Sequence, residues 1–128
     1  MEKTVIQTKN APGAVGPYSQ AVRVGSFLYT AGQIGLDPES GRMVADDIEV
    51  QTDRVLKNLK AVLQASGGDL SDVVKTTVFL LYMGEFGVMN KVYASFFGDN
   101  PPARSAVQVA ALPLGGRIEI EAVAYLGK

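Results

Sequence analysis

Neither cysteine nor histidine occurs in this sequence of 128 residues. Their absence excludes disulfides, thiol nucleophiles, serine–histidine triads and the usual cysteine and histidine zinc sites. If the chain is an enzyme, its chemistry must come from carboxylates, arginine, lysine, tyrosine, hydroxyls, backbone amides and water.

The sequence also lacks a strong charge of either sign and a long apolar run. Its net charge is −1 and its isoelectric point is about 5.3, so no basic field favours a nucleic acid or an anionic membrane as partner. No run of 18 apolar residues suggests a membrane span. We expect a cytoplasmic protein with neither kind of partner.

Length and apolar content indicate one domain over residues 1–128. A chain of this length buries about two thirds of the surface that it exposes when unfolded. Hydrophobic residues make up 47% of the sequence, which is enough for a core and for further apolar surface.

The first third of the chain predicts three short strands. Residues 4–7 are typical of an edge strand, and residues 21–24 and 27–30 flank Gly25-Ser26. A two-residue connection with glycine first favours a type II′ hairpin turn. Gly32 follows the third strand, where glycine permits either a bulge or the close approach of a ligand to the backbone.

Two amphipathic helices are predicted further on. Asp46 and Glu49 have the spacing of a capping box at the start of the first helix, and Gly67-Gly68 ends it. The second helix runs from about Glu85 to Phe97. Its apolar face holds one amide, Asn90, which either hydrogen-bonds to backbone or points into a pocket, because an unpaired buried amide costs about 1–3 kcal/mol.

The remaining strands complete an α+β pattern. Residues 73–81 predict a central strand, a further strand begins after Pro101-Pro102, and the last covers residues 117–126. The order β-β-β-α-β-α-β-β favours two helices on one face of a mixed sheet. The other face would then be apolar and uncovered, which normally means subunit contact.

Arg104 is the first candidate for a binding role. Pro101-Pro102 stiffens the chain before it, and the neighbours Ala103, Ser105 and Ala106 are small. A guanidinium with free space beside it suits a carboxylate, which it binds through two parallel hydrogen bonds. The alternative is an ordinary surface arginine at the start of a strand.

Glu119 is the candidate general base. The last strand follows the Arg104 strand through a short turn, so we expect the two to pair antiparallel and to bring Glu119 near Gln108. In a chain without histidine, Glu119 is then the plausible base opposite Arg104. The alternative is a solvated strand residue. Tyr18, in a loop, is either a packing residue or a pocket residue.

Five segments resemble the successive signatures of one family. They are Gly16-Pro17-Tyr18-Ser19-Gln20, Thr30-Ala31-Gly32-Gln33, Val73-Val74-Lys75-Thr76-Thr77-Val78, Pro102-Ala103-Arg104-Ser105 and Ile118-Glu119-Ile120-Glu121-Ala122. Along the length of the chain and in this order, they resemble the Rid (YjgF) family, closest to its RidA-type imine deaminases.

This resemblance implies a chorismate-mutase-like fold and a homotrimer whose sheets form a central β-barrel, with active sites in the clefts between subunits. It also implies the hydrolysis of reactive 2-imino acids, formed from 2-aminoacrylate and its homologues, to 2-oxo acids and ammonia. It implies neither a metal nor an organic cofactor.

The resemblance also implies roles for individual residues. Arg104 matches the arginine that binds the substrate carboxylate, and Glu119 the glutamate that positions or activates the hydrolytic water. Tyr18, Asn90 and Gly32 match pocket positions of the family. At the position of Gly32, a backbone amide faces the ligand.

Two pocket positions depart from the family pattern. Members commonly carry serine where this chain has Ala31, and many carry cysteine where it has Ala106. The first change removes a hydroxyl that could bond substrate or water, and the second removes a thiol. Both bear on efficiency and substrate preference, and the sequence leaves open a non-catalytic trimer that binds small carboxylic metabolites.

Overall fold

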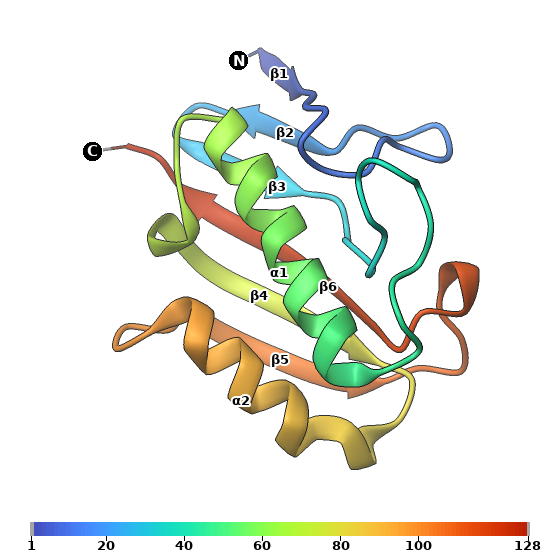
Figure 1. Ribbon diagram of the computed structural model, residues 1–128. Coiled ribbons are helices and arrows are strands. Elements are labelled where there is room, and N and C mark those ends of the chain that lie inside the picture. The colour runs from blue at the N-terminus through green and yellow to red at the C-terminus, as the bar shows by residue number, and fades with distance from the viewer. Residues whose placement is uncertain (1, 128) are drawn as a thin grey trace.

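The computed structural model describes residues 2–127; Met1 and Lys128, the ends of the expected domain, lie outside them. A six-stranded mixed sheet carries two helices on one face (Figure 1). The strands are β1 (Lys3–Ile6), β2 (Ala21–Val24), β3 (Phe27–Thr30), β4 (Val73–Leu80), β5 (Ala103–Gln108) and β6 (Ile118–Tyr125). The helices are α1 (Ile48–Ala65) and α2 (Phe86–Phe97), with the 3₁₀ turns η1 (Leu70–Asp72), η2 (Met83–Glu85) and η3 (Pro113–Gly115). The predicted α+β class and element order are confirmed.

The strand order in the sheet is β1-β2-β3-β6-β4-β5. The chain places β4 inside the sheet, as expected, and pairs it with β5 in parallel through the α2 crossover. The expected antiparallel pairing of β5 with β6 is therefore wrong, because β6 crosses over β4 and inserts between β3 and β4. Gln108 and Ile118 both pair with Leu80, from opposite sides.

The predicted β2–β3 hairpin is confirmed. Val24 pairs with Phe27 across the two-residue connection, and Gly25 has a φ of 60°. Ser26 is not among the residues with positive φ. Positive φ at the first position alone fits the type II′ turn.

Helix α1 forms on the predicted apolar face but begins one residue later than the capping pattern suggested. Asp47, not Asp46, is the N-cap, and its Oδ2 accepts a hydrogen bond of 2.9 Å from Val50 N. Asp46 instead forms an ion pair of 2.7 Å with Arg117, at the start of β6. The capping-box spacing favoured Asp46, because Glu49 lies three residues after it, whereas Val50 lies three residues after Asp47.

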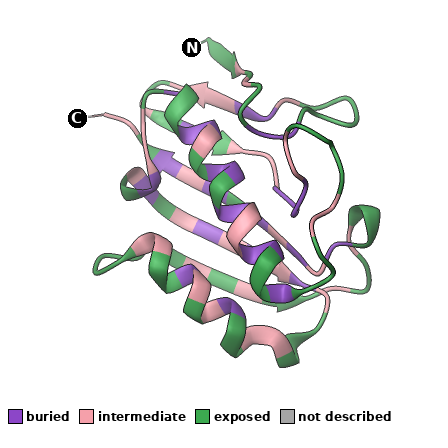
Figure 2. Ribbon diagram, in the orientation of Figure 1, coloured by how far each residue is buried: buried purple, intermediate pink, exposed green. Residues whose placement is uncertain are grey.

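The core lies between the two helices and the sheet, where buried residues run as stripes along both (Figure 2). From α1 they are Ile48, Val55, Leu56, Leu59, Val62 and Leu63, and from β6 Ile118, Ile120, Ala122 and Ala124. Both sets have the spacing expected of a buried face, which is two along β6 and three or four along α1. Within residues 2–127, no helix is long and apolar enough to cross a membrane.

The opposite face of the sheet carries no helix and is apolar. We call it the open face; its apolar residues alternate with the buried ones and are Val5, Val22, Val24, Phe27, Tyr29, Phe79, Val107, Val123 and Tyr125. Tyr29 is 50% exposed and Tyr125 44%. This face also carries Lys75, Thr77, Ser105, Glu119 and Glu121. So many exposed apolar side chains on one sheet face are nevertheless unusual for a monomer.

Candidate functional site

Arg104 lies on the helix side of β5 and rests on two aromatic rings of α2. Its Cζ is 4.8 Å from the ring centroid of Tyr93 and 5.3 Å from that of Phe86. Within residues 2–127, no carboxylate or carbonyl oxygen pairs with this guanidinium. Its five N–H donors are therefore available to a ligand from outside the chain.

Asn90 joins Arg104 on this side of the molecule. It follows Phe86 by one helical turn and precedes Tyr93 by another, so it lies between the two rings that the guanidinium covers. Its Oδ1 is buried and accepts no hydrogen bond. Of the two alternatives, the structure therefore excludes a backbone hydrogen bond to this oxygen. Ala106, two residues after Arg104 on β5, faces the helices as Arg104 does. We call the group the arginine cluster; its members are Phe86, Asn90, Tyr93, Arg104 and Ala106.

Glu119 lies on the other face of the sheet, beside a separate cavity of about 300 Å³. We call this cavity the glutamate pocket; its lining includes Tyr18, Ala31, Gly32, Pro113 and Glu119. Three predicted substrate-binding positions and the predicted base therefore come together. Ala31 and Gly32 reach Glu119 because Gln33 pairs with Ile120 through backbone hydrogen bonds of 2.9 and 3.1 Å.

Gly32 leaves room for the side chain of Glu119. A Cβ at this position would lie 2.7 Å from Cδ of Glu119, closer than real Cβ contacts come. The Glu119 side chain therefore lies directly over the Gly32 backbone, and neither a bulge nor a ligand is needed to account for the glycine.

The carboxyl of Glu119 ionises less readily than usual. Burial raises its pKa, and the neighbouring Glu121 carboxylate, two residues away on the same face, raises the pKa further. A carboxylate whose pKa is moved toward neutrality is a better proton acceptor for a water molecule at physiological pH.

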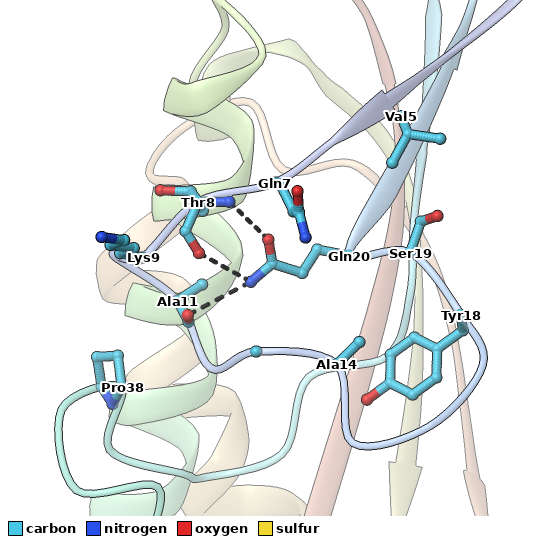
Figure 3. Close-up of a pocket in the computed structure, with 11 residues that line it drawn as sticks. Val5, Gln7, Thr8, Lys9, Ala11, Ala14, Tyr18, Ser19, Gln20 and Pro38 are labelled. Carbon is cyan, nitrogen blue, oxygen red and sulfur yellow. Dashed lines mark hydrogen bonds between the residues drawn. The ribbon is translucent and has the colours of Figure 1, made fainter.

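Tyr18 belongs to a loop that a buried glutamine holds in place. Gln20 Nε2 donates to the carbonyl oxygens of Thr8 and Ala11, and Gln20 Oε1 accepts from Thr8 N at 2.7 Å (Figure 3). Gln20 Nε2 also donates to the carbonyl oxygen of Pro12. A second cavity of about 740 Å³ lies along this loop, with the Tyr18 ring beside Ala14. It contains none of the other predicted site residues, so we place the chemistry at the glutamate pocket.

The arginine cluster and the glutamate pocket do not meet within one chain. Arg104 is in register with Thr76, and Thr76 with Ala122, which faces the helices. Glu119 points to the opposite face, three residues along and two strands away, roughly 14 Å from Arg104 between Cα atoms by standard strand spacings. The expectation that Glu119 and Arg104 face one another across a pocket is wrong for a single chain.

Sequence reasoning missed the residues that support the site. Phe86 and Tyr93 lie on the apolar face predicted for the second helix and pack in or against the core, but their contact with the Arg104 side chain was not predicted. Gln20 has no distinctive signal beyond its place in the Gly16–Gln20 segment. Within residues 2–127, no three histidine, cysteine, aspartate or glutamate side chains cluster so as to hold a metal ion.

Comparison with known proteins places these features in context. The family model described as "Endoribonuclease L-PSP" matches residues 8–126. A RutC family protein of Pyrococcus horikoshii is 54% identical over 123 residues, which cover 96% of this chain and 98% of that protein. A Homo sapiens protein named 2-iminobutanoate/2-iminopropanoate deaminase is 51% identical over 125 residues, covering 98% of this chain and 91% of that one.

The fold is also similar to that of solved structures. A crystal structure described as a putative endoribonuclease from Thermotoga maritima superposes with a TM-score of 0.96 at 52% sequence identity, covering 100% of both chains. Identity at this level over the whole length means that the two chains share the sheet order and both helices.

Proposed function

Because the chain belongs to the endoribonuclease L-PSP (Rid/YjgF) family and is about half identical to named imine deaminases, we infer that it hydrolyses 2-imino acids to 2-oxo acids and ammonia. It is a reactive-intermediate deaminase. Its substrates are small imino acids and its products are oxo acids. The preferred substrates that we propose are 2-iminopropanoate and 2-iminobutanoate.

The observation that carries this proposal is the unpaired guanidinium of Arg104. Charged groups that are partly buried are normally paired, because desolvation without a partner is costly. The rings of Phe86 and Tyr93 cover the guanidinium without taking up its hydrogen-bonding edge. A planar carboxylate fits this edge, and every 2-imino acid carries one.

The glutamate pocket supplies the group that handles the water. An imine carbon is already electrophilic, so no covalent nucleophile is required. The oxygen of water forms a bond to this carbon, and Glu119 takes the proton that the water gives up. Glu119 gives this proton to the nitrogen, which yields a carbinolamine. It then takes the hydroxyl proton of the carbinolamine as the C=O bond forms and passes it to nitrogen as the C–N bond breaks, so that ammonia leaves. Positioning and proton transfer are each worth orders of magnitude in rate.

We propose that one active site uses the arginine cluster of one copy and the glutamate pocket of another. The two sets point away from each other in one chain, so both reach one substrate only where two copies meet. The apolar open face supports the contact, as in a homotrimer whose sheets form a central barrel. We also propose that residues 1–128 of each copy form one domain.

We expect the assembly in solution to have three times the 13.6 kDa mass of one chain. Size-exclusion chromatography with light scattering at micromolar concentration measures this mass. The apolar open face makes a free monomer unfavourable, since burying such area stabilises by about 25 cal/mol per Å². A monodisperse monomer would contradict both the trimer and the shared site.

The reaction itself is tested by trapping. An amino-acid oxidase generates 2-imino acids in place, and semicarbazide competes with the protein for them. Substoichiometric protein is expected to lower the semicarbazone yield and to speed the release of 2-oxo acid. Binding of pyruvate without such acceleration would instead make the chain a carboxylate-binding protein. Because its substrate is short-lived, the enzyme must share the compartment where imines form, which we propose is the cytoplasm.

A further inference from the structure

The Arg104 side chain is held by rings, whereas a binding arginine is more often held by acceptor oxygens. Tyr93 and Phe86 lie 4.8 and 5.3 Å from its Cζ, and the described residues 2–127 offer it no ion pair. Arginine has a long side chain with several rotatable bonds, so an unsupported guanidinium would sample many directions. Contacts with two ring faces restrict it without using any of its N–H donors.

The Tyr93 ring is itself fixed from behind. Its hydroxyl and Thr76 Oγ1 are 2.6 Å apart in a buried hydrogen bond, and its ring packs on Phe97 with centroids 4.5 Å apart. Thr76 is the β4 residue in register with Arg104. The strand position that aligns the Arg104 backbone therefore also aligns the ring beneath its side chain. Burial raises the pKa of Tyr93, so its hydroxyl keeps its proton at neutral pH.

We propose that Phe86 and Tyr93 are positioning residues that hold the Arg104 guanidinium with its N–H edge toward the substrate carboxylate, and that Thr76 orients Tyr93. This inference rests on the proposed function, because it assumes that Arg104 binds a carboxylate. A planar guanidinium has two faces and an edge. The guanidinium carbon lies over both rings, and within residues 2–127 no ion pair takes up its N–H edge, which remains for two parallel hydrogen bonds.

Calorimetric titration with pyruvate, a 2-oxo acid product, tests the inference without requiring turnover. Tyr93→Leu and Phe86→Leu are each expected to weaken pyruvate binding between about 3-fold and 30-fold. In the trapping assay they raise KM by a similar factor and change kcat little, since the carboxylate is bound equally before and during reaction. Tyr93→Phe keeps the ring but loses the hydrogen bond to Thr76, so it is expected to weaken pyruvate binding by less than Tyr93→Leu does. Unchanged affinity in Tyr93→Phe would overturn the role of Thr76.

Phe97→Leu is the matched control, because Phe97 packs on Tyr93 but has no contact with Arg104. It is expected to lower stability as the other leucine variants do and to leave pyruvate affinity unchanged. Wild-type affinity in Tyr93→Leu and Phe86→Leu, or equal weakening in Phe97→Leu, would overturn the positioning role and leave the deaminase function standing. Pyruvate binding that follows the expected pattern without any imine turnover would overturn the deaminase function alone. A wild-type protein that does not bind pyruvate would overturn both.

Discussion

Replacing Arg104 with alanine is expected to lower kcat/KM for 2-iminopropanoate by about 30- to 5,000-fold. The range corresponds to the loss of about 2–5 kcal/mol when one partner of a desolvated, hydrogen-bonded charge pair is removed. The melting temperature should fall by a few degrees at most, because the side chain contributes only its ring contacts to the fold. The trapping assay and thermal denaturation measure the two effects.

Arg104→Lys separates geometry from charge. Lysine keeps the positive charge but offers no planar pair of donors, so it is expected to lose most of the same activity. Arg42→Ala serves as a control, since Arg42 is an exposed arginine outside both clusters. Turnover close to wild type in Arg104→Ala would contradict a role of Arg104 in substrate binding and leave it a structural residue at the start of β5.

Replacing Glu119 with glutamine is expected to lower kcat by about 100- to 10,000-fold while pyruvate still binds. Glutamine keeps the size and hydrogen bonding of the side chain and removes the base. If Glu119 only anchored Arg104 of a neighbouring copy, pyruvate affinity would fall together with turnover. Calorimetry beside the trapping assay distinguishes the two roles, and unchanged activity would remove Glu119 from the mechanism.

The pH profile adds an independent reading of Glu119. A base must be ionised, so activity is expected to fall as the pH drops through the pKa of Glu119, which burial and Glu121 hold above the ordinary glutamate value. Glu121→Gln removes the second cause, lowers this pKa and should move the acidic limb to lower pH. An acidic limb that Glu121→Gln leaves in place would assign the titration to another group.

The local structure followed from spacing along the chain. Alternation by two gave both faces of β6, and the apolar repeat gave the buried face of α1. Gly25 before Ser26 gave the hairpin. These features depend on neighbours within a few residues, which the sequence displays directly. The cap of α1 was wrong by one residue because the spacing of Asp46 and Glu49 fits a capping box, whereas Asp47 caps the helix with its side chain alone and Asp46 pairs with Arg117.

The arrangement of the site depended on contacts that the sequence does not display. Short connections usually join neighbouring strands, which predicted that β5 and β6 would pair. The α2 crossover places β5 beside β4, and β6 takes the interior position that remains. Arg104 and Glu119 consequently face opposite sides. The sequence predicted one site from these residues, and their division into two groups within one chain follows from the strand order.

Complementation between two inactive variants tests the shared site most directly. Arg104→Ala and Glu119→Gln chains, carrying different tags, are expressed together in equal amounts, and assemblies that contain both are purified and assayed. If each site takes Arg104 from one copy and Glu119 from another, every mixed trimer has one complete site in three, so the purified mixed assemblies are expected to restore about one third of wild-type turnover. Each variant assembled alone gives the baseline. Mixed assemblies that stay at this baseline would contradict an active site formed between copies.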